Sequence, residues 1–463
     1  MQLETPEDWL PVLTYRLDLQ QPIIFGLRQF VNGDAPLPEM GKNTRATWIA
    51  FQREARTNFG AIACQSHANR IRVRGVRVGA DDQSPESLTA RRIARDNGLS
   101  RVIGDAVWDM LSARTGYLLV SDDGGRAVLT AEQPEQFYAE PDPLRSWRAR
   151  AAIKVWRDTV QGVDFAVVWV NGNRQSFSRT STINSSSVDR VVRMTNSGGW
   201  EVAGAPEPFT GSVPVWIFQR RDGMGLIEPH LDILNRINRV KLARLSITAI
   251  QAFKQRALTK EPGARLPEKD EAGNPIDWAK VFEPAPGALW DLPAGINIWE
   301  SGQTDIRPLL DAEKADARDF AAATGTPISM LQPDSQNQSA AGASATTDQQ
   351  VESCRDDIEN IKPAAAAAMV TALLIEGVDV AGQTVEVDFE KPEASTLAEK
   401  MDAYSKAIAA GMSVSVAQKE FLSWSQTQID EDEQSRRRDA ARSLMNALAA
   451  QPPQPVPASA SNG

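Results

Sequence analysis

The apolar residues of this 463-residue chain follow two spacings, one typical of helices and one typical of strands. The helical spacing predicts helices over residues 9–30, 47–69 and 88–110, the last with a break at Asn97–Gly98. Between the second and third helices, Arg70, Arg72 and Arg74 alternate with apolar residues. This alternation predicts a half-buried strand with one basic face. We favour pairing of that face with acidic residues of a neighbouring element over contact with phosphate.

Residues 115–221 have the pattern of antiparallel β-structure. Residues 115–133 form a predicted hairpin whose turn is Asp122–Gly125, and Asn171–Gly172 is a type I′ turn signal. Further strand-like runs are residues 151–156, 164–170, 174–179, 191–194 and 211–221. This region is therefore predicted to be rich in β-strands.

A long helix is predicted at Pro229–Leu258, and it is apolar on two sides. It contains six Lys/Arg and one acid, a net charge of +5. Its basic residues include Arg236, Arg239, Arg244 and Lys254. A helix that is apolar on two sides needs two packing partners, one of which could be another subunit. The basic side either pairs with the acidic helix at 301–324 across a subunit contact or forms a cationic ring near DNA, and we favour pairing.

Residues 325–347 form a polar stretch in which Asp334 is the only charge. Two acidic segments, predicted as helices at 305–324 and 348–362, flank it. Residues 301–360 contain 11 acidic and 4 basic residues, which accounts for −7 of the net charge of −10 of the whole chain. Each fixed Lys or Arg contact to phosphate adds salt-dependent affinity for nucleic acid. An uncharged loop between acidic helices would instead touch a polyanion lightly and let it slide.

The remaining C-terminal half is predicted to be mostly helical. A proline-rich stretch at 262–300 predicts a small insertion of turns and short strands. The helix at Ala343–Glu376 contains Pro363, which predicts a kink or break, although Pro363 could also mark a helix boundary. A strand at 385–390 and helices at 396–410, 414–424 and 430–449 follow, and residues 451–463 are predicted to be a disordered tail.

The totals narrow the functional classes. The length predicts two or more domains, and 42% hydrophobic and 24% charged residues are ordinary for a soluble protein. We expect no membrane span and no signal peptide, and with Cys64 and Cys354 as the two cysteines we expect the reducing cytoplasm. The acidic balance is atypical of a protein that reads DNA sequence.

Enzyme signatures are absent from the sequence. There is no phosphate-binding GxxxxGK[ST], no HExxH, no GxSxG and no GxGxxG. His67 lies one helical turn after Cys64, a spacing that suits a thiolate pair or a metal site, but an ordinary helix face is favoured. We therefore expect no catalytic residue, no cofactor and no metal site.

The order of segments resembles the portal proteins of tailed bacteriophages, in the branch common among phages of actinobacteria. The resemblance covers residues 9–448 and rests on five loose motifs in sequence order: RTNFGAIACQSHANRIRVRGV (56–76), ARDNGLSRVIGDAVWDMLSARTGYLLV (94–120), GSVPVWIFQRRDGMGLIEPHLDILNRIN (211–238), TGTPISMLQ (324–332) and KPEASTLAEKMDAYSKAIAAGMSVS (391–415).

The resemblance implies an α+β, mainly helical portal-type fold. Its implied parts are a wing (1–228), stem helix 1 (229–258), a clip (259–302), stem helix 2 (303–325), a tunnel loop (326–345), a long kinked helix with a wing-closing strand (346–392), a helical crown (393–450) and the tail (451–463).

It also implies a homo-oligomeric ring, usually twelve-fold, at one capsid vertex of the virion, assembled in the host cytoplasm. Double-stranded DNA would pass through its channel without sequence-specific binding. The implied protein partners are the terminase large subunit, the major capsid protein, and scaffolding and head-completion (adaptor) proteins.

Within this scheme three groups of residues are candidates for the site. The channel loop is Ser335, Gln336, Asn337, Gln338 and Ser339; the acidic stem is Asp305, Asp311, Glu313, Asp316 and Asp319; the basic stem helix is Arg236, Arg239, Arg244 and Lys254. An acidic lining would keep the duplex near the axis by repulsion.

Two other classes remain open. An oligomeric helical adaptor or scaffold without a DNA channel would share the helices that suit oligomer formation. A DNA-modifying or nucleotide enzyme would need clustered acids, of which Asp356, Asp357 and Glu359 are the nearest set.

Overall fold

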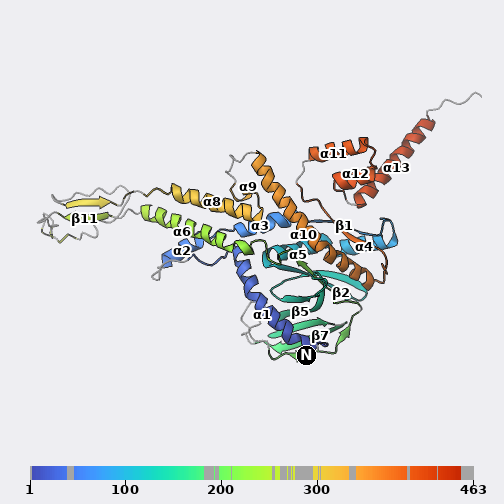
Figure 1. The fold of residues 1–463 in the computed structure, drawn as a ribbon, viewed down its shortest axis with the longest axis horizontal. Coiled ribbons are helices and arrows are strands. Elements are labelled where there is room, and N and C mark those ends of the chain that lie inside the picture. The colour runs from blue at the N-terminus through green and yellow to red at the C-terminus, as the bar shows by residue number, and fades with distance from the viewer. Residues whose placement is uncertain are drawn as a thin grey trace, which may run out of the picture.

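The structure of the chain is a computed structural model (Figure 1). It describes residues 3–38, 46–170, 172–181, 192, 198–209, 211–252, 256–260, 268–269, 273, 275–276, 296–300, 302, 304–332, 340–393, 397–424 and 426–449. The predicted turn at Asn171, most of the 191–194 strand, most of the 262–300 insertion and the 451–463 tail lie outside these residues.

Helix α1 (Pro6–Val31) links the two halves of the body. It begins with a capping box in which Thr5 and Asp8 satisfy each other's backbone N–H groups, and Pro6 occupies the first helical position. The N-terminal half, including Leu13 and Leu17, packs on a large sheet, whereas Leu27 and Phe30 enter the main core. The helix predicted over 9–30 is therefore confirmed and slightly longer.

The large sheet has six strands in the order β4-β5-β6-β7-β8, with β9 also paired to β7. Their bounds are β4 Phe137–Pro141, β5 Ala149–Asp158, β6 Val163–Val170, β7 Asn173–Thr180, β8 Glu201–Val202 and β9 Glu207–Pro208. Alternate residues of β5, β6 and β7 are buried, which matches the period-two pattern of the sequence.

A buried charge ladder crosses this sheet and was not predicted. Asp164 on β6 is fully buried between Arg157 on β5 and Arg179 on β7, with Nε–Oδ distances of 2.7 and 3.3 Å. The register sets the three residues opposite one another, so the two guanidinium groups compensate the carboxylate that folding removes from water.

The second sheet has the order β10-β2-β3, built from β2 (Thr115–Asp123), β3 (Arg126–Glu132) and β10 (Val215–Gln219). The predicted hairpin is confirmed, with Asp123 opposite Arg126 across the turn. One face carries Leu118 and Phe218 into the main core, and the other packs toward the large sheet.

Two long helices pack on the core face of this sheet: α5 (Leu99–Ala113) and α10 (Ala340–Ile375). At Gly116, a Cβ would lie 1.9 Å from the carbonyl oxygen of Ala106 on α5, so the close approach of helix and strand requires glycine. By length and mean hydropathy of 1.4, Thr347–Ile375 could cross a membrane, yet its apolar residues, such as Ala368 and Leu373, belong to the core.

The α10 helix stays helical through Pro363, so the break considered from the sequence does not occur. Its residues Ile361, Ala364, Ala365 and Ala368 are buried. The packing of this face in the core accounts for the helix continuing where a proline removes one backbone hydrogen bond.

The segment predicted as one helix at 47–69 is two helices, α2 (Ala46–Glu54) and α3 (Phe59–Ala68). The strand after it, β1 (Val73–Val78), begins later than predicted and pairs with β13 (Val385–Phe389). Of the three arginines in the predicted basic face, Arg74 contacts Asp388 of β13 at 3.8 Å, so the expected pairing with an acid is found at this residue. Arg70 instead donates to the Pro392 carbonyl at 2.6 Å, and Arg77, which was not part of the prediction, pairs with Glu386. The predicted break at Asn97–Gly98 is also confirmed, because it separates α4 (Pro85–Asp96) from α5.

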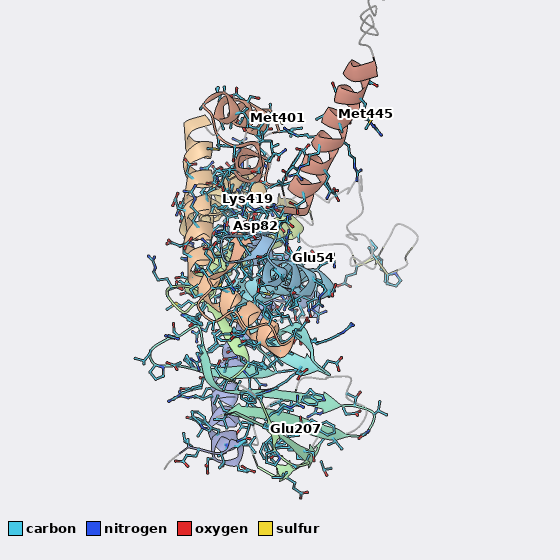
Figure 2. All side chains as sticks on the ribbon, turned by 90° about the vertical axis from the view of Figure 1, so that its right-hand side faces the viewer. Glu54, Asp82, Glu207, Met401, Lys419 and Met445 are labelled. Carbon is cyan, nitrogen blue, oxygen red and sulfur yellow. The ribbon has the colours of Figure 1, made fainter. Side chains whose placement is uncertain are left out.

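The C-terminal helices are α11 (Leu397–Ala409), α12 (Val414–Phe421) and α13 (Gln426–Ala449), close to the predicted ranges. No described side chain of α11 is buried, and α13 projects from the body, with Met445 on its distal half (Figure 2). The whole fold is α+β with more helix than strand, as predicted. The assignment of its parts to a portal stays a prediction.

Candidate functional site

An arm formed by α6 (Leu231–Ala252) and α8 (Arg307–Thr324) projects from the body (Figure 1). Beyond these helices, β11 (Arg256–Lys260) pairs antiparallel with β12 (Ile296–Glu300). The helix predicted to reach Leu258 thus ends by Ala252, and the residues from Arg256 are a strand. A short 3-10 turn, η1 (Glu228–His230), precedes α6.

Ion pairs join the two arm helices along their length. Arg236 contacts Asp316 at 2.8 Å and Asp319 at 3.0 Å, and Glu313 contacts Lys241 at 3.4 Å and Arg244 at 3.2 Å. The α8 acids are spaced three residues apart, so they share one face of the helix. Charge complementarity between these segments is therefore satisfied within one chain, whereas the sequence interpretation placed it between subunits.

These contacts change the charge that α8 presents to solvent. The side chains of Glu313 and Asp316 are 18% and 13% exposed, because they face α6. Asp319 is largely exposed but also contacts Arg236. Asp311 is exposed and has no ion pair among the contacts of the described residues. Asp305 lies just before α8 and contacts Arg307 at 3.9 Å.

The remaining predicted site residues divide into two groups. Arg239 is exposed, and the described part of the chain offers it no ion-pair partner. Lys254 and the channel-loop residues 335–339 lie outside the described residues. Part of the acidic stem (Glu313, Asp316 and Asp319) is thus brought together with Arg236 and Arg244 of the basic stem, and the loop group is not tested.

The root of the arm is buried in the main core. Leu234 and Ile237 of α6 and Phe320 of α8 belong to that core. The side-chain oxygen of Asn238 accepts hydrogen bonds from the backbone N–H of Thr57 at 2.9 Å and from its hydroxyl at 3.0 Å. Helix α2 also packs on α6. The second packing partner expected for α6 therefore lies in the same chain.

Two described segments, α9 (Ile328–Leu331) and the part of α10 around Gln349, lie beside the end of α8. Gly325 ends α8 in the left-handed conformation, with φ of 67°, and short helix α9 follows. The Gln349 side chain on α10 donates a hydrogen bond to the Ala322 carbonyl at 3.2 Å. These contacts hold α9 and Gln349 near the root of the arm.

A buried polar seam lies between α10 and the residues around His67. The Gln350 amide donates to Ser66 Oγ at 2.9 Å, and Arg220 contacts Asp357 at 3.3 Å. Burial lowers the pKa of His67 to about 4 and raises the pKa of Asp357 to about 6, the latter opposed by Arg220. The sequence did not predict this seam, because polar residues at these positions are also common on the exposed face of a helix.

The two cysteines are also buried, and burial raises the pKa of both Cys64 and Cys354 to about 12. A thiol with so high a pKa is a weak nucleophile at neutral pH. Cys64 and His67 are both buried side chains of α3, whereas the sequence favoured an ordinary helix face.

The acidic set considered for an enzyme does not converge. Asp357 faces Arg220, Asp356 lies 3.7 Å from Arg221, and Glu359 pairs with Lys362. Across the part of the chain that the structure describes, no three or more His, Cys, Asp and Glu residues are grouped to hold a metal ion.

The chain matches no family model and no curated protein. Among solved structures, it is similar to a chain in the virion of a native gene transfer agent (GTA) particle, at 13% identity and a TM-score of 0.44, over 87% of this chain and 99% of that chain. A chain in the neck of the native GTA particle, with C12 symmetry, gives 14% identity and a TM-score of 0.42 over 85% and 98%.

A chain in the neck of the empty GTA particle, with C6 symmetry, gives 13% identity and a TM-score of 0.44 over 85% and 97% of the two chains. Similarities with TM-scores below 0.5 do not establish a shared fold or function. The function therefore has to be argued from the residues and contacts of this chain.

Proposed function

We propose that this chain is the subunit of a portal ring at one capsid vertex of a phage-like virion. Twelve copies would enclose a channel through which double-stranded DNA is packaged and ejected. The ring would dock the terminase large subunit, the head-completion (adaptor) proteins, the scaffolding protein and the major capsid protein. In this proposal the protein has no catalytic role of its own.

The observation that carries the proposal is the arm together with the order of the segments that follow it. Two antiparallel helices extend from the body, and their distal ends are joined by the strand pair β11–β12. The chain then turns at Gly325 and passes through segment 333–339 into α10. This order agrees with the stem, clip, stem, tunnel loop and long helix that the sequence resemblance implies.

The ion pairs refine the electrostatic part of the proposal. Duplex DNA carries about one negative charge per 1.7 Å of its axis, so a wall rich in free cations would bind it tightly and slow its passage. Arg236 and Arg244 are held by α8 acids and are less available to phosphate. A largely neutralised arm and an uncharged loop would both allow DNA to slide.

Electron-microscope class averages of the purified full-length protein test the proposal directly. We expect rings with a central opening wide enough for a DNA duplex. A compact monomer would contradict the proposal. A closed assembly without an opening would favour the oligomeric adaptor without a DNA channel.

The role of the loop has a separate test. Replacing Gln336, Asn337 and Gln338 with lysine should slow DNA packaging or release, because each added cation binds phosphate. The matched control carries the same number of lysines on the exposed face of α13, two of them at Gln434 and Ser435. Unchanged kinetics in the loop variant would mean that the segment acts as a spacer.

A further inference from the structure

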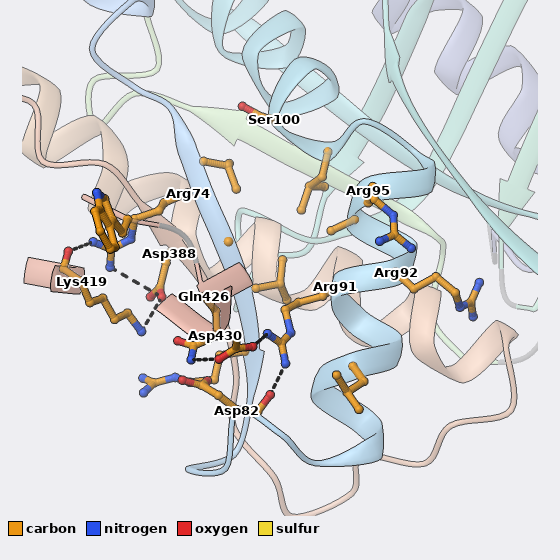
Figure 3. A pocket seen from close by; sticks show the side chains of 18 residues that line it. Arg74, Asp82, Arg91, Arg92, Arg95, Ser100, Asp388, Lys419, Gln426 and Asp430 are labelled. Carbon is orange, nitrogen blue, oxygen red and sulfur yellow. Dashed lines mark hydrogen bonds and ion pairs between the residues drawn. The ribbon is translucent and has the colours of Figure 1, made fainter. Parts of the chain in front are cut away.

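Two cavities of similar size differ in the chemistry of their walls. One, of about 610 Å³, lies between β1, α4, α12 and α13. Each cation of its lining is ion-paired with a carboxylate, as Arg91 is with Asp430, so its charges are satisfied within the chain (Figure 3). The other cavity, of about 660 Å³, lies between α10, β2, β6, β10 and the end of β9, and its lining is mostly apolar.

The walls of this second cavity, which we call the apolar groove, combine one face of α10 with aromatic side chains. The residues from α10 are spaced three and four apart, so they share one face of the helix; they include Ala367, Val370, Thr371 and Leu374. The other elements contribute the aromatic side chains of Trp169, Phe209 and Trp216. Leu374 is 54% exposed, so the described chain leaves this part of the groove uncovered.

The charged side chains of the groove are held by other groups of the chain. Arg174 pairs with Glu207, and Asp122 accepts a hydrogen bond from the backbone N–H of Gly125 at 2.7 Å. Within the described part of the chain, no cation of this lining is left without an ion pair. The groove is therefore suited to an uncharged ligand.

A smaller cavity continues the groove along the large sheet. It has a volume of about 360 Å³, shares Ser121, Trp169 and Arg174 with the groove, and extends to Trp156. The Trp156 ring stacks on that of Phe165, with 5.5 Å between the ring centroids. Aromatic side chains thus line both cavities, an arrangement that suits an extended chain.

One polar group of the groove lacks a hydrogen-bond partner. Trp216 is 4% exposed, and its buried indole Nε1 makes no hydrogen bond with any described residue. A buried N–H without an acceptor is unfavourable, because water no longer supplies its hydrogen bond. A carbonyl group that entered the groove beside Trp216 would supply the missing acceptor.

The chain itself contains a segment of matching chemistry at residues 451–457, beyond α13. Its sequence, QPPQPVP, places Pro452 and Pro455 in the PxxP spacing, and residues 450–463 carry no charged side chain. Segments of this kind bind aromatic-lined grooves in the polyproline II conformation, whose backbone carbonyls make no internal hydrogen bonds. Such a carbonyl is the acceptor that Trp216 lacks.

The position of α13 directs this segment to another copy of the chain. Two residues separate Pro452 from Ala449, the last residue of α13, so Pro452 lies within about 11 Å of the helix end. Figure 2 shows Met445 of α13 and Glu207 of the groove at opposite ends of the molecule, and Figure 1 shows α13 on the opposite side of the body from β7. The segment is therefore out of reach of the groove of its own copy.

We propose that the apolar groove binds the proline-rich segment 451–457 of a second copy of this chain. Leu374 and the aromatic side chains pack on the proline rings, and Trp216 donates a hydrogen bond to a carbonyl of the segment. This contact between copies goes beyond the proposed function, because it requires no DNA channel.

The test measures binding of a fluorescein-labelled synthetic peptide of residues 450–463 by fluorescence anisotropy. The receptor is the full-length chain with Pro452 and Pro455 replaced by alanine, so that its own segments do not compete with the peptide. We expect Leu374→Glu in this receptor to weaken binding about tenfold or more, because it places a charge on the apolar wall. Trp216→Phe, which removes the indole N–H, should weaken binding about two- to tenfold.

Leu144→Glu is the matched control, because Leu144 is 93% exposed, lies outside the lining of the groove, and its replacement changes the net charge equally. Equal effects of the two glutamate variants would overturn the proposal, as would absence of peptide binding by the receptor. A second peptide, with alanine at the positions of Pro452 and Pro455, should bind about tenfold more weakly, because it is less preorganised. Equal binding of the two peptides would assign the groove to apolar segments in general and overturn the proposal. None of these outcomes affects the ring test of the proposed function.

Discussion

Helix α10 and the arm helices α6 and α8 are all long, but they are held in place by different forces. The α10 helix contributes Ile361, Ala368 and Leu373 to the main core, each at 0% exposure. Beyond its root, the arm buries fewer apolar residues, such as Leu242 and Ala317, and is also held by the pairs that Arg236, Lys241 and Arg244 make with α8 acids.

The difference in forces predicts a difference in stability. Burial of apolar surface contributes about 25 cal/mol per Å², whereas an exposed ion pair contributes between about 0 and 1 kcal/mol. The region around α10 should therefore set the free energy of unfolding of the body. The arm should open locally at a much lower free-energy cost, and it should respond to salt.

The largest effect is expected at the contact between β2 and α5. In Gly116→Ala, the new Cβ would lie 1.9 Å from the Ala106 carbonyl oxygen, so the strand and helix must separate. We expect a loss of about 4 kcal/mol or more, measured by chemical denaturation. Gly104→Ala on α5 is the control, because its Cβ meets nothing within 4 Å, and it should be neutral or slightly stabilising. Similar losses in both variants would show that the close approach is not the cause.

A second comparison uses two neighbouring leucines of α10. Leu373 is 0% exposed and Leu374 is 54% exposed. We expect Leu373→Ala to lower the free energy of unfolding by about 2–5 kcal/mol, and Leu374→Ala to change it by less than about 1 kcal/mol. Equal effects in thermal or denaturant unfolding would contradict the view that α10 is held by its buried face.

The pH dependence of stability tests the buried polar residues beside α10. The folded-state pKa of Asp357 is about 6, above its ordinary value of 3.8, so the folded state binds its proton more tightly than the unfolded state does. Its ionisation therefore destabilises the folded protein as pH rises from about 4 to about 6. We expect the stability of wild type minus that of Asp357→Asn to fall by about 1–3 kcal/mol over this window.

His67 acts in the opposite direction, because its pKa is lowered to about 4 and its charging opposes folding below about pH 6. Asp109, beside Arg28, has a pKa raised to about 6 and adds to the Asp357 effect. The difference in stability between wild type and Asp357→Asn separates the contribution of Asp357 from those of His67 and Asp109. A difference that stays constant from pH 4 to 7 would show that Asp357 does not titrate in the folded protein as expected.

The smallest effect is expected in the arm. Arg236→Ala removes two contacts to α8, and we expect a loss of less than about 1 kcal/mol that disappears at high salt. Hydrogen exchange of the α8 backbone should become faster without a change in the body. Arg239→Ala is the control, because Arg239 is also an exposed arginine of α6 and has no ion pair among the described residues. A large, salt-independent loss at Arg236 would mean that the arm is as firmly held as α10.

Local patterns predicted most elements of this fold. The alternation in β5, β6 and β7, the hairpin around Gly124 and the break at Asn97–Gly98 follow from short-range chemistry, and they appear in the structure. The late start of β1 and the end of α6 by Ala252 were missed, because strand pairing decides where those elements begin and end.

The candidate site was predicted less completely. The opposite charges of α6 and α8 indicated pairing, but a charge count cannot tell whether the partner is the same chain or another. The ladder around Asp164 and the seam around Asp357 depend on long-range register and packing, which no local pattern records. The cleft between β1, α4, α12 and α13 is lined by residues more than three hundred positions apart in the sequence, such as Arg95 and Asp430.

The antiparallel course of the arm has a consequence for how this protein could change over time. The chain leaves the root through α6 and returns through α8, and β11 and β12 bring the outgoing and returning chain side by side at the far end. Insertions, deletions or whole replacements between Lys260 and Ile296 would therefore leave the body's packing unaltered. Lineages could exchange this stretch of the chain while inheriting the rest of the molecule intact.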